Sequence, residues 1–105
     1  MRIIDEKEFD LLINSSKKPL VVDFFATWCG PCRMLTQVLE DIEQKHGDKI
    51  EIVKVDVDDS FNLAKRFGIM SVPTILLFEN GNMRDKMVGY RSVEDFEEFL
   101  LPFIQ

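Results

Sequence analysis

Residues 21–32, with the sequence VVDFFATWCGPC, carry the strongest structural signals in the chain. Their first part belongs to the run 20–26, which is short and rich in β-branched and aromatic residues, so we expect a strand buried on both faces. Pro31 fits the first turn of a helix, because a proline nitrogen there needs no intrahelical partner. The sequence therefore predicts a strand that leads directly into a helix, with the only two cysteines, Cys29 and Cys32, at the junction.

Helix caps and the spacing of apolar residues predict the other elements. The first helix is expected over residues 5–14, because Asp5 and Glu8 form the pattern of a capping box. Asn80-Gly81 separates two strand-like runs, and this dipeptide is a strong signal for a β-hairpin. The expected strands cover residues 20–26, 50–57, 74–80 and 83–89, and the expected helices cover residues 5–14, 31–46, 60–67 and the segment from residue 92 onward.

The same patterns assign side chains to the core and to helix ends. The apolar stripe of the second helix is expected to comprise Met34, Leu35, Val38, Leu39 and Ile42, and the inward residues of the last helix Phe96, Phe99, Leu100 and Phe103. We expect Asp58 or Asp59 to cap the helix over residues 60–67 and Gly68 to end it. Pro102 is expected to kink or fray the final turn of the last helix.

The expected order of elements is β-α-β-α-β-α-β-β-α, which adds a first strand without an assigned range to the four strands given above. Strands and helices that alternate call for parallel strands joined by right-handed crossovers, whereas the closing hairpin is antiparallel. We therefore expect an α/β fold with a central mixed sheet, mostly parallel, and helices on both faces. Because the chain has 105 residues and contains no linker or repeat, residues 1–105 are expected to form a single domain.

Composition and charge exclude several classes of function. The chain has 19 acidic and 13 basic residues and a formal net charge of -6, so it lacks the excess of Lys and Arg that a phosphate-backbone binder needs. The first residues lack the apolar core of a secretory signal, and no apolar run approaches the ~20 residues of a membrane helix. We therefore expect a cytoplasmic monomer that binds neither nucleic acid nor membranes.

The two cysteines are expected to form a redox-active pair. Cys29 lies at the predicted helix start, where unpaired N–H groups and the helix dipole favour the thiolate and lower its pKa. Cys32, one turn inside the helix, suits the role of resolving thiol, and Gly30 and Pro31 keep the link compact. A metal site is disfavoured because His46 is the only further ligand of the usual kind for zinc. Two inert thiols are disfavoured because the pair follows a strand and opens a helix.

Several motifs together resemble those of the thioredoxin family. They are WCGPC at residues 28–32, Asp23 in the preceding strand, Val72-Pro73-Thr74 before a later strand, and Gly81 and Gly89. The resemblance covers essentially the whole chain and implies the thioredoxin fold. It also implies a general protein-disulfide reductase that cycles Cys29–Cys32 between dithiol and disulfide and serves cell redox homeostasis. The expected partners are protein substrates that contain disulfides and a separate thioredoxin reductase, which uses NADPH and a flavin, whereas the chain itself is expected to bind no cofactor.

The resemblance further implies roles for residues around the pair. Asp23 is expected to lie behind Cys32, to have a raised pKa and to accept the Cys32 proton. Lys54 is expected to offset part of the buried negative charge of Asp23. Pro73 is expected to follow a cis peptide bond and to leave the backbone of Val72 free to pair with an extended substrate segment. The expected substrate surface is exposed and apolar and comprises Trp28, Gly30, Pro31, Val72 and Gly89.

Residue patterns alone leave simpler alternatives open. Asp23 can face solvent at a strand edge, Lys54 can extend along the surface, Pro73 can be trans and Trp28 can pack in the core. The chain also departs from the family pattern, with Gln37 in place of a helix-kinking proline, Phe25 where a tryptophan is frequent, and the bulkier Tyr90-Arg91 after Gly89. Two other functions compete with the reductase: an oxidase or isomerase with the same cysteine chemistry, and a binding module in which the thiols are incidental. Gly30-Pro31 between the cysteines resembles the reducing members of the family.

Overall fold

A five-stranded sheet organises this computed structural model, which describes residues 1–105. The strands are β1 (Arg2–Ile3), β2 (Leu20–Phe25), β3 (Glu51–Asp56), β4 (Thr74–Glu79) and β5 (Asn82–Val88), and they lie in the order β1-β3-β2-β4-β5. β3 pairs in parallel with β1 and β2, whereas β4 pairs antiparallel with β2 and β5. The predicted α/β fold with a mixed sheet and an antiparallel C-terminal hairpin is confirmed. The expectation that pairing outside the hairpin is parallel was wrong, because β4 also pairs antiparallel with β2.

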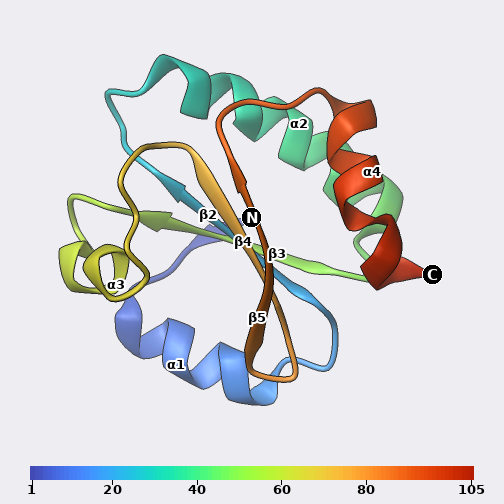
Figure 1. The fold of residues 1–105 in the computed structure, drawn as a ribbon, viewed down its shortest axis with the longest axis horizontal. Coiled ribbons are helices and arrows are strands. Elements are labelled where there is room, and N and C mark those ends of the chain that lie inside the picture. Colours follow the sequence, from blue (N-terminus) through green and yellow to red (C-terminus); the bar gives the residue numbers. More distant parts are fainter.

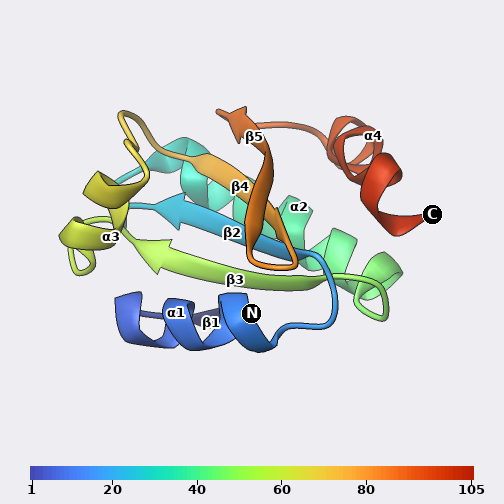
Figure 2. The ribbon, with the colours of Figure 1, turned by 60° about the horizontal axis from the view of Figure 1, so that its bottom comes forward.

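Four helices cover the two faces of this sheet. They are α1 (Glu6–Ser15), α2 (Gly30–His46), α3 (Phe61–Arg66) and α4 (Val93–Ile104), and the nine elements follow the predicted order. α2 and α4 lie on one face, and α1 lies on the other (Figures 1 and 2). α3 joins the α1 face, because its buried Leu63 and Ala64 belong to the same cluster as Phe9 of α1. None of these helices combines the length and the apolar character that a membrane span requires.

The side chains of β2 alternate between two apolar cores. Val21 belongs to the core under α2 and α4, whereas Leu20, Val22 and Phe24 belong to the core under α1 and α3. Successive side chains of a strand point to opposite faces, so Asp23 faces the α2 side with Val21. All six residues of β2 are buried, as predicted. The strand therefore carries a carboxyl group into the interior on the face that α2 covers.

Local signals fix most of the element ends. The Asp5 side chain accepts the Glu8 N–H at 2.9 Å while Glu8 accepts the Asp5 N–H at 3.3 Å, which confirms the capping box. Asn80 and Gly81 have φ angles of 51° and 82°, as a two-residue hairpin turn of this kind requires. Gly68 follows α3 with φ 64°, which confirms it as the residue that ends this segment.

Two side-chain predictions were wrong. Met34 is 58% exposed, because it lies beside the buried stripe of α2 rather than within it; Cys32, Leu35, Val38, Leu39 and Ile42 form that stripe. Neither Asp58 nor Asp59 caps α3, whose N-cap is Ser60 without a side-chain hydrogen bond. Instead, the N–H groups of Asp58 and Asp59 both donate to the Asp56 carboxylate, so these residues form a turn before the helix.

Pro102 in α4 and Gln37 in α2 are the two positions at which the sequence raised the question of a kinked helix. α4 includes Pro102 and continues to Ile104, and α2 runs without a break through Gln37. On the inner side of α4, Phe96 and Leu100 are buried, and Phe99 and Phe103 are partly buried against the same core. The predicted inward face of α4 is therefore confirmed, and it closes the core over α2.

Candidate active site

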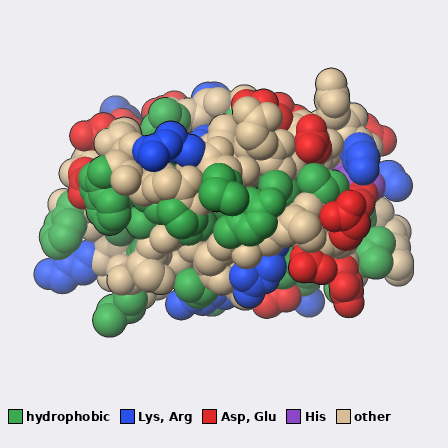
Figure 3. Space-filling view, turned by 90° about the horizontal axis from the view of Figure 1, so that it is seen from above, with side chains coloured by type: hydrophobic (Ala, Val, Ile, Leu, Met, Phe, Trp, Pro, Cys, Tyr) green, Lys and Arg blue, Asp and Glu red, His purple; other side chains and the backbone are tan.

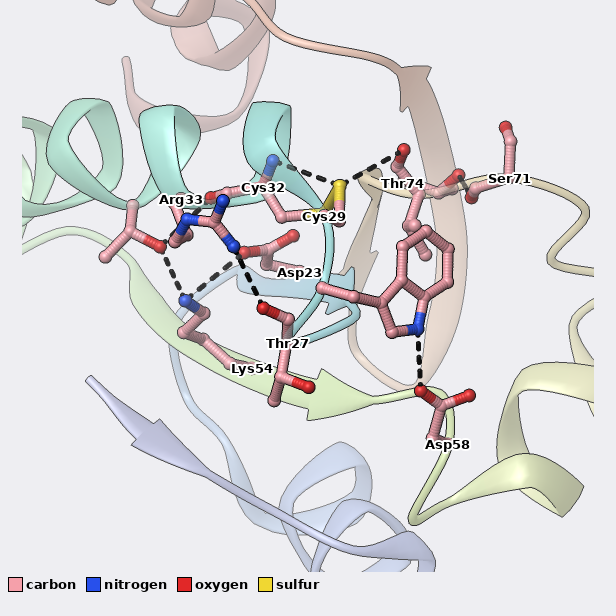
Figure 4. The surroundings of a disulfide bond; sticks show 12 residues. Asp23, Thr27, Cys29, Cys32, Arg33, Lys54, Asp58, Ser71 and Thr74 are labelled. Atoms are coloured by element: carbon pink, nitrogen blue, oxygen red, sulfur yellow. Dashed lines mark hydrogen bonds and ion pairs between the residues drawn. A yellow bond between two sulfur atoms is a disulfide. The ribbon is translucent and has the colours of Figure 1, made fainter.

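The cysteine pair lies at the start of α2, immediately after the turn that follows β2. Cys29 is the N-cap residue of the helix, with an extended backbone, and Pro31 lies in the first turn. The Cys32 N–H donates to Cys29 Sγ over 3.2 Å (Figure 4). One of the N–H groups that a helix start leaves unpaired is thus satisfied by sulfur. The predicted helix start beneath Cys29 is confirmed.

The two sulfurs form a disulfide, so the structure holds the oxidised form of the pair. The Cα atoms of Cys29 and Cys32 are 5.3 Å apart, within the range that a disulfide spans without backbone movement. Both residues are buried, with 5% of Cys29 and 1% of Cys32 exposed. The larger exposed fraction of Cys29 favours it as the residue whose sulfur a substrate reaches first.

The position of Cys29 at the helix start stabilises the negative charge of its thiolate form. The Cys32 N–H already points at Cys29 Sγ, and the positive end of the α2 dipole lies at the same place. Both interactions stabilise negative charge on sulfur more than a neutral thiol. The arrangement therefore suits a nucleophile that must be ionised at neutral pH.

Asp23 is buried beneath the disulfide without a hydrogen-bond partner for either carboxyl oxygen. Burial raises its pKa from 3.8 to about 7, and the nearby Lys54 ammonium partly offsets this rise. Figure 4 shows the carboxyl group between Lys54 and the start of α2. The expected raised pKa is confirmed, and the alternative of a solvent-facing carboxylate is excluded because Asp23 is 0% exposed.

Lys54 reaches the same interior from the neighbouring strand. It lies directly beside Asp23 in the parallel register of β2 and β3, and its Nζ atom is 3.9 Å from Asp23 Oδ2. Nζ also donates to Thr36 Oγ1 at 2.6 Å and lies 4.5 Å from the centre of the Phe25 ring. The side chain is only 11% exposed, so it does not extend along the surface. These contacts place a cation next to Asp23 in a long ion pair, without a hydrogen bond between the two groups.

The loop before β4 completes the surroundings of Cys29, because Thr74 pairs with Phe24 at the end of β2 from which the cysteines follow. The Val72–Pro73 peptide bond is cis, as predicted, and Val72 O lies 3.7 Å from Cys29 Sγ. The Gly89 N–H donates to Pro73 O at 2.8 Å, which ties the end of β5 to this loop. Segments far apart in the sequence therefore meet at the sulfur of Cys29.

Trp28 lies on the surface beside the pair, and 70% of it is exposed. This excludes the alternative of core packing. Its indole N–H donates to Asp58 Oδ2 at 3.0 Å, so the ring is held by the turn after β3 (Figure 4). Pro31 is exposed as well, and Gly30, Val72 and Gly89 are half-buried, whereas Pro73 is buried. Hydrophobic side chains form a band across the face shown in Figure 3, with charged side chains mainly around it.

Sequence reasoning missed two residues that contact the site. Thr36 accepts from Lys54, and its own hydroxyl donates to Cys32 O at 3.1 Å. Its position four residues after Cys32 on one helix is the signal that points to it. Asp58, the partner of the Trp28 indole, has no such local signal, because the two residues are 30 positions apart.

Comparisons with known proteins agree with this geometry. The family model for thioredoxin matches residues 1–101. A thioredoxin from Alicyclobacillus acidocaldarius is 43% identical over 84% of each chain, and one from Bacillus subtilis is 37% identical over 95% of this chain and 96% of its own. The chain spans about half, 51%, of a chloroplastic thioredoxin M5 from Oryza sativa that is 41% identical.

A solved structure gives the same result for the three-dimensional arrangement. The thioredoxin of Malassezia sympodialis superimposes with a TM-score of 0.88 at 34% identity, covering 100% of this chain and 91% of that one. Proteins of the family exchange a dithiol for the disulfide of a protein substrate, and a thioredoxin reductase reduces them again. The bonded Cys29–Cys32 pair fits that chemistry. The chain belongs to the thioredoxin family and is a protein-disulfide reductase.

Proposed function

We propose that Cys29 is the attacking thiol of this reductase and Cys32 the resolving thiol. The observation that carries the assignment is the Cys32 N–H directed at Cys29 Sγ at the start of α2. In the first step the Cys29 thiolate attacks one sulfur of a substrate disulfide. A mixed disulfide forms, and the second substrate sulfur leaves as a thiolate that takes a proton from water.

Asp23 serves the second step as proton acceptor. A carboxyl group with a pKa of about 7 is partly ionised at neutral pH and can take the Cys32 proton, directly or through a water molecule. The Cys32 thiolate then attacks Cys29 Sγ and releases the substrate as a thiolate. Two electrons have passed to the substrate, and Cys29–Cys32 is oxidised. Lys54 keeps the Asp23 pKa from rising further, so that the acceptor remains available.

The substrate surface comprises Trp28, Gly30, Pro31, Val72 and Gly89, with Pro73 shaping the loop beneath it. Support comes from the 3.7 Å contact of Val72 O with Cys29 Sγ, because an extended substrate segment that reaches this sulfur must also pass Val72. The apolar side chains of this surface carry no charge that would reject one substrate in favour of another. The surface therefore suits many different protein disulfides.

The electron donor is a reductase that uses NADPH and a flavin, and the compartment is the cytoplasm, where the dithiol form persists. The protein acts as a monomer, and residues 1–105 form one domain. A single sheet lies between the two large cores, which supports the assignment of one domain.

Insulin reduction coupled to NADPH through an added thioredoxin reductase tests the reductase and the roles of its cysteines. Cys29→Ser should abolish turnover, because the nucleophile is absent. Cys32→Ser should form mixed disulfides that mass spectrometry detects as covalent adducts, because the attack remains and the resolution is lost. Turnover by Cys29→Ser, or adducts on Cys29→Ser instead of Cys32→Ser, would reverse the assignment. A strongly oxidising equilibrium of the pair with glutathione would instead favour an oxidase.

A further inference from the structure

Thr36 is the hydrogen-bond partner of the Lys54 ammonium, although no step of the reductase mechanism uses it. Lys54 Nζ donates to Thr36 Oγ1 at 2.6 Å, whereas it stays 3.9 Å from Asp23 Oδ2 without a hydrogen bond. A lysine ammonium has three donors on a flexible stem of four carbon atoms, so its place in a folded protein depends on the acceptors around it. Thr36 Oγ1 is the acceptor that meets this ammonium in the structure.

The hydroxyl of Thr36 is itself oriented by the backbone of α2. It donates to Cys32 O at 3.1 Å, one turn earlier on the helix. A hydroxyl has one hydrogen to donate and two lone pairs, so this bond leaves the lone pairs available to Lys54. Thr36 therefore links the carbonyl group of the resolving cysteine to the cation beside Asp23.

Water competes with Thr36 for the Lys54 ammonium. A cavity of about 240 Å³ borders both side chains, and the rest of its lining is Phe25, Ala26, Thr27, Cys32 and Arg33. A polar cavity of this size has room for several water molecules. In a buried ion pair the loss of hydration offsets most of the attraction, so an ammonium without a buried acceptor gains more from water than from a buried carboxylate. Without the Thr36 hydroxyl, we therefore expect Lys54 Nζ to move into this cavity, away from Asp23.

Asp23 responds to such a movement because few charged groups face it. Lys54 reaches it from β3, and the two cysteines at the start of α2 titrate near it in the reduced form. β4 places the apolar Ile75 beside it in the register, and α4 directs apolar residues to the same core. Arg33 of α2 instead directs Nη1 to Thr27 O at 3.0 Å (Figure 4). The position of one ammonium group therefore controls how readily Asp23 ionises.

We propose that Thr36 is a positioning residue of the resolving step, whose hydroxyl holds the Lys54 ammonium in the interior beside Asp23. Loss of this hydroxyl lets the ammonium move into water, so the Asp23 carboxylate loses its neighbouring charge and binds its proton more tightly. Less Asp23 is then ionised at neutral pH, and Cys32 transfers its proton more slowly. This role of Thr36 rests on the proposed function of Asp23 as proton acceptor.

An NMR titration of the Asp23 carboxyl in the oxidised protein tests the positioning, because neither cysteine titrates in the disulfide. Thr36→Val replaces the hydroxyl by a methyl group of similar size, and the midpoint should rise by about 1 pH unit. Coulomb's law gives this shift for a unit charge that moves from 3.9 Å to roughly 6 Å at an effective dielectric constant of about 20. Thr36→Ser retains the hydroxyl and should retain the wild-type midpoint. Thr27→Val removes a different hydroxyl from the lining of the same cavity and, as the matched control, should leave the midpoint unchanged.

A double variant separates an effect through Lys54 from a merely structural one. Lys54→Met should raise the Asp23 midpoint, and the addition of Thr36→Val should raise it no further, because the ammonium that Thr36 holds is already absent. An unchanged or lower midpoint in Thr36→Val, or an equal further rise in the double variant, overturns the proposal. The wild type provides a test that needs no variant. The Lys54 ammonium hydrogens should exchange with water more slowly than those of the exposed Lys7, and equal exchange overturns the proposal as well.

Stopped-flow reduction of dithiobis-nitrobenzoate connects the position of Lys54 to the reaction. One coloured thiolate leaves when Cys29 attacks this disulfide, and the second leaves when Cys32 resolves the mixed disulfide. Thr36→Val should shift the pH profile of the second phase upward together with the NMR midpoint, and Thr36→Ser should restore the wild-type profile. A raised midpoint with an unchanged second phase overturns the role of Asp23 as proton acceptor, whereas an unchanged midpoint overturns only the role of Thr36.

Discussion

Asp23→Asn should make the oxidised protein more stable, and the gain should grow as the pH rises. The carboxyl group is 0% exposed and has no hydrogen-bond partner, so its ionised form is poorly solvated in the folded state. Burial accordingly raises its pKa from 3.8 to about 7. Asparagine has nearly the same shape and carries no charge at any pH.

The magnitude follows from the linkage between proton binding and folding. Between pH 4 and 7 the unfolded chain releases the Asp23 proton while the folded chain keeps it, so the wild type loses stability as the pH rises through this window. The pKa difference between 3.8 and about 7, at 1.36 kcal/mol per unit, corresponds to about 4 kcal/mol. Most of this penalty is absent at pH 4 and fully present above pH 7. Asp23→Asn escapes it at every pH.

Urea unfolding of the oxidised proteins at several pH values between 4 and 8 measures the effect. The difference in unfolding free energy between Asp23→Asn and the wild type should rise by about 4 kcal/mol from pH 4 to pH 8. Asp48→Asn makes the same chemical change at an exposed position and serves as the matched control. A difference for Asp23→Asn that is flat with pH, like that expected of the control, would refute the burial argument.

Three further substitutions test other parts of the structure. Lys54→Met removes the cation that lowers the Asp23 pKa, so an NMR titration of the Asp23 carboxyl should give a midpoint above about 7; an equal or lower midpoint would contradict the 3.9 Å contact as its cause. Ser92→Ala removes the side-chain cap of α4 and should lower the free energy of unfolding in urea by about 1 kcal/mol. Ser60→Ala changes a cap residue without such a hydrogen bond and should lower it less, so equal losses would count against the capping argument. Gly68→Ala should lower the free energy of unfolding by about 1 kcal/mol, because the φ angle of 64° disfavours a residue with a Cβ atom even though nothing lies within 4 Å of it. An unchanged free energy of unfolding in urea would contradict this backbone argument.

Much of the fold follows from signals within a few residues of one another. The buried strand before the cysteines, the helix start at Pro31, the capping box at Asp5 and the turn at Asn80-Gly81 are all local patterns. Each depends on backbone geometry or on donors that a neighbouring side chain satisfies. The sequence could therefore place these elements, although their ends shift by a residue or two.

Predictions failed where two local solutions compete. Asp58 and Asp59 both suit a helix cap, but Asp56 satisfies their N–H groups and leaves Ser60 at the cap position. Met34 suits the apolar stripe by type, yet the faces of α2 that the sheet and α4 cover do not include it. The turn at Asp56 is a second local pattern that wins over the cap, whereas the exposure of Met34 depends on how neighbouring elements pack, which a local pattern does not contain.

The sequence alone determined that a strand enters a helix at Cys29 and that two thiols share its first turn, because chain connectivity and helix geometry leave little choice there. Tertiary structure decided the environment of those thiols. The register of β2 against β3 sets Lys54 beside Asp23, and the sheet removes water from that carboxyl, which raises its pKa. Likewise, Val72 and Gly89 reach the site only through the packing of β4 and β5. Desolvation and long-range hydrogen bonds arise from residues that meet only in the folded chain, so no local pattern specifies them.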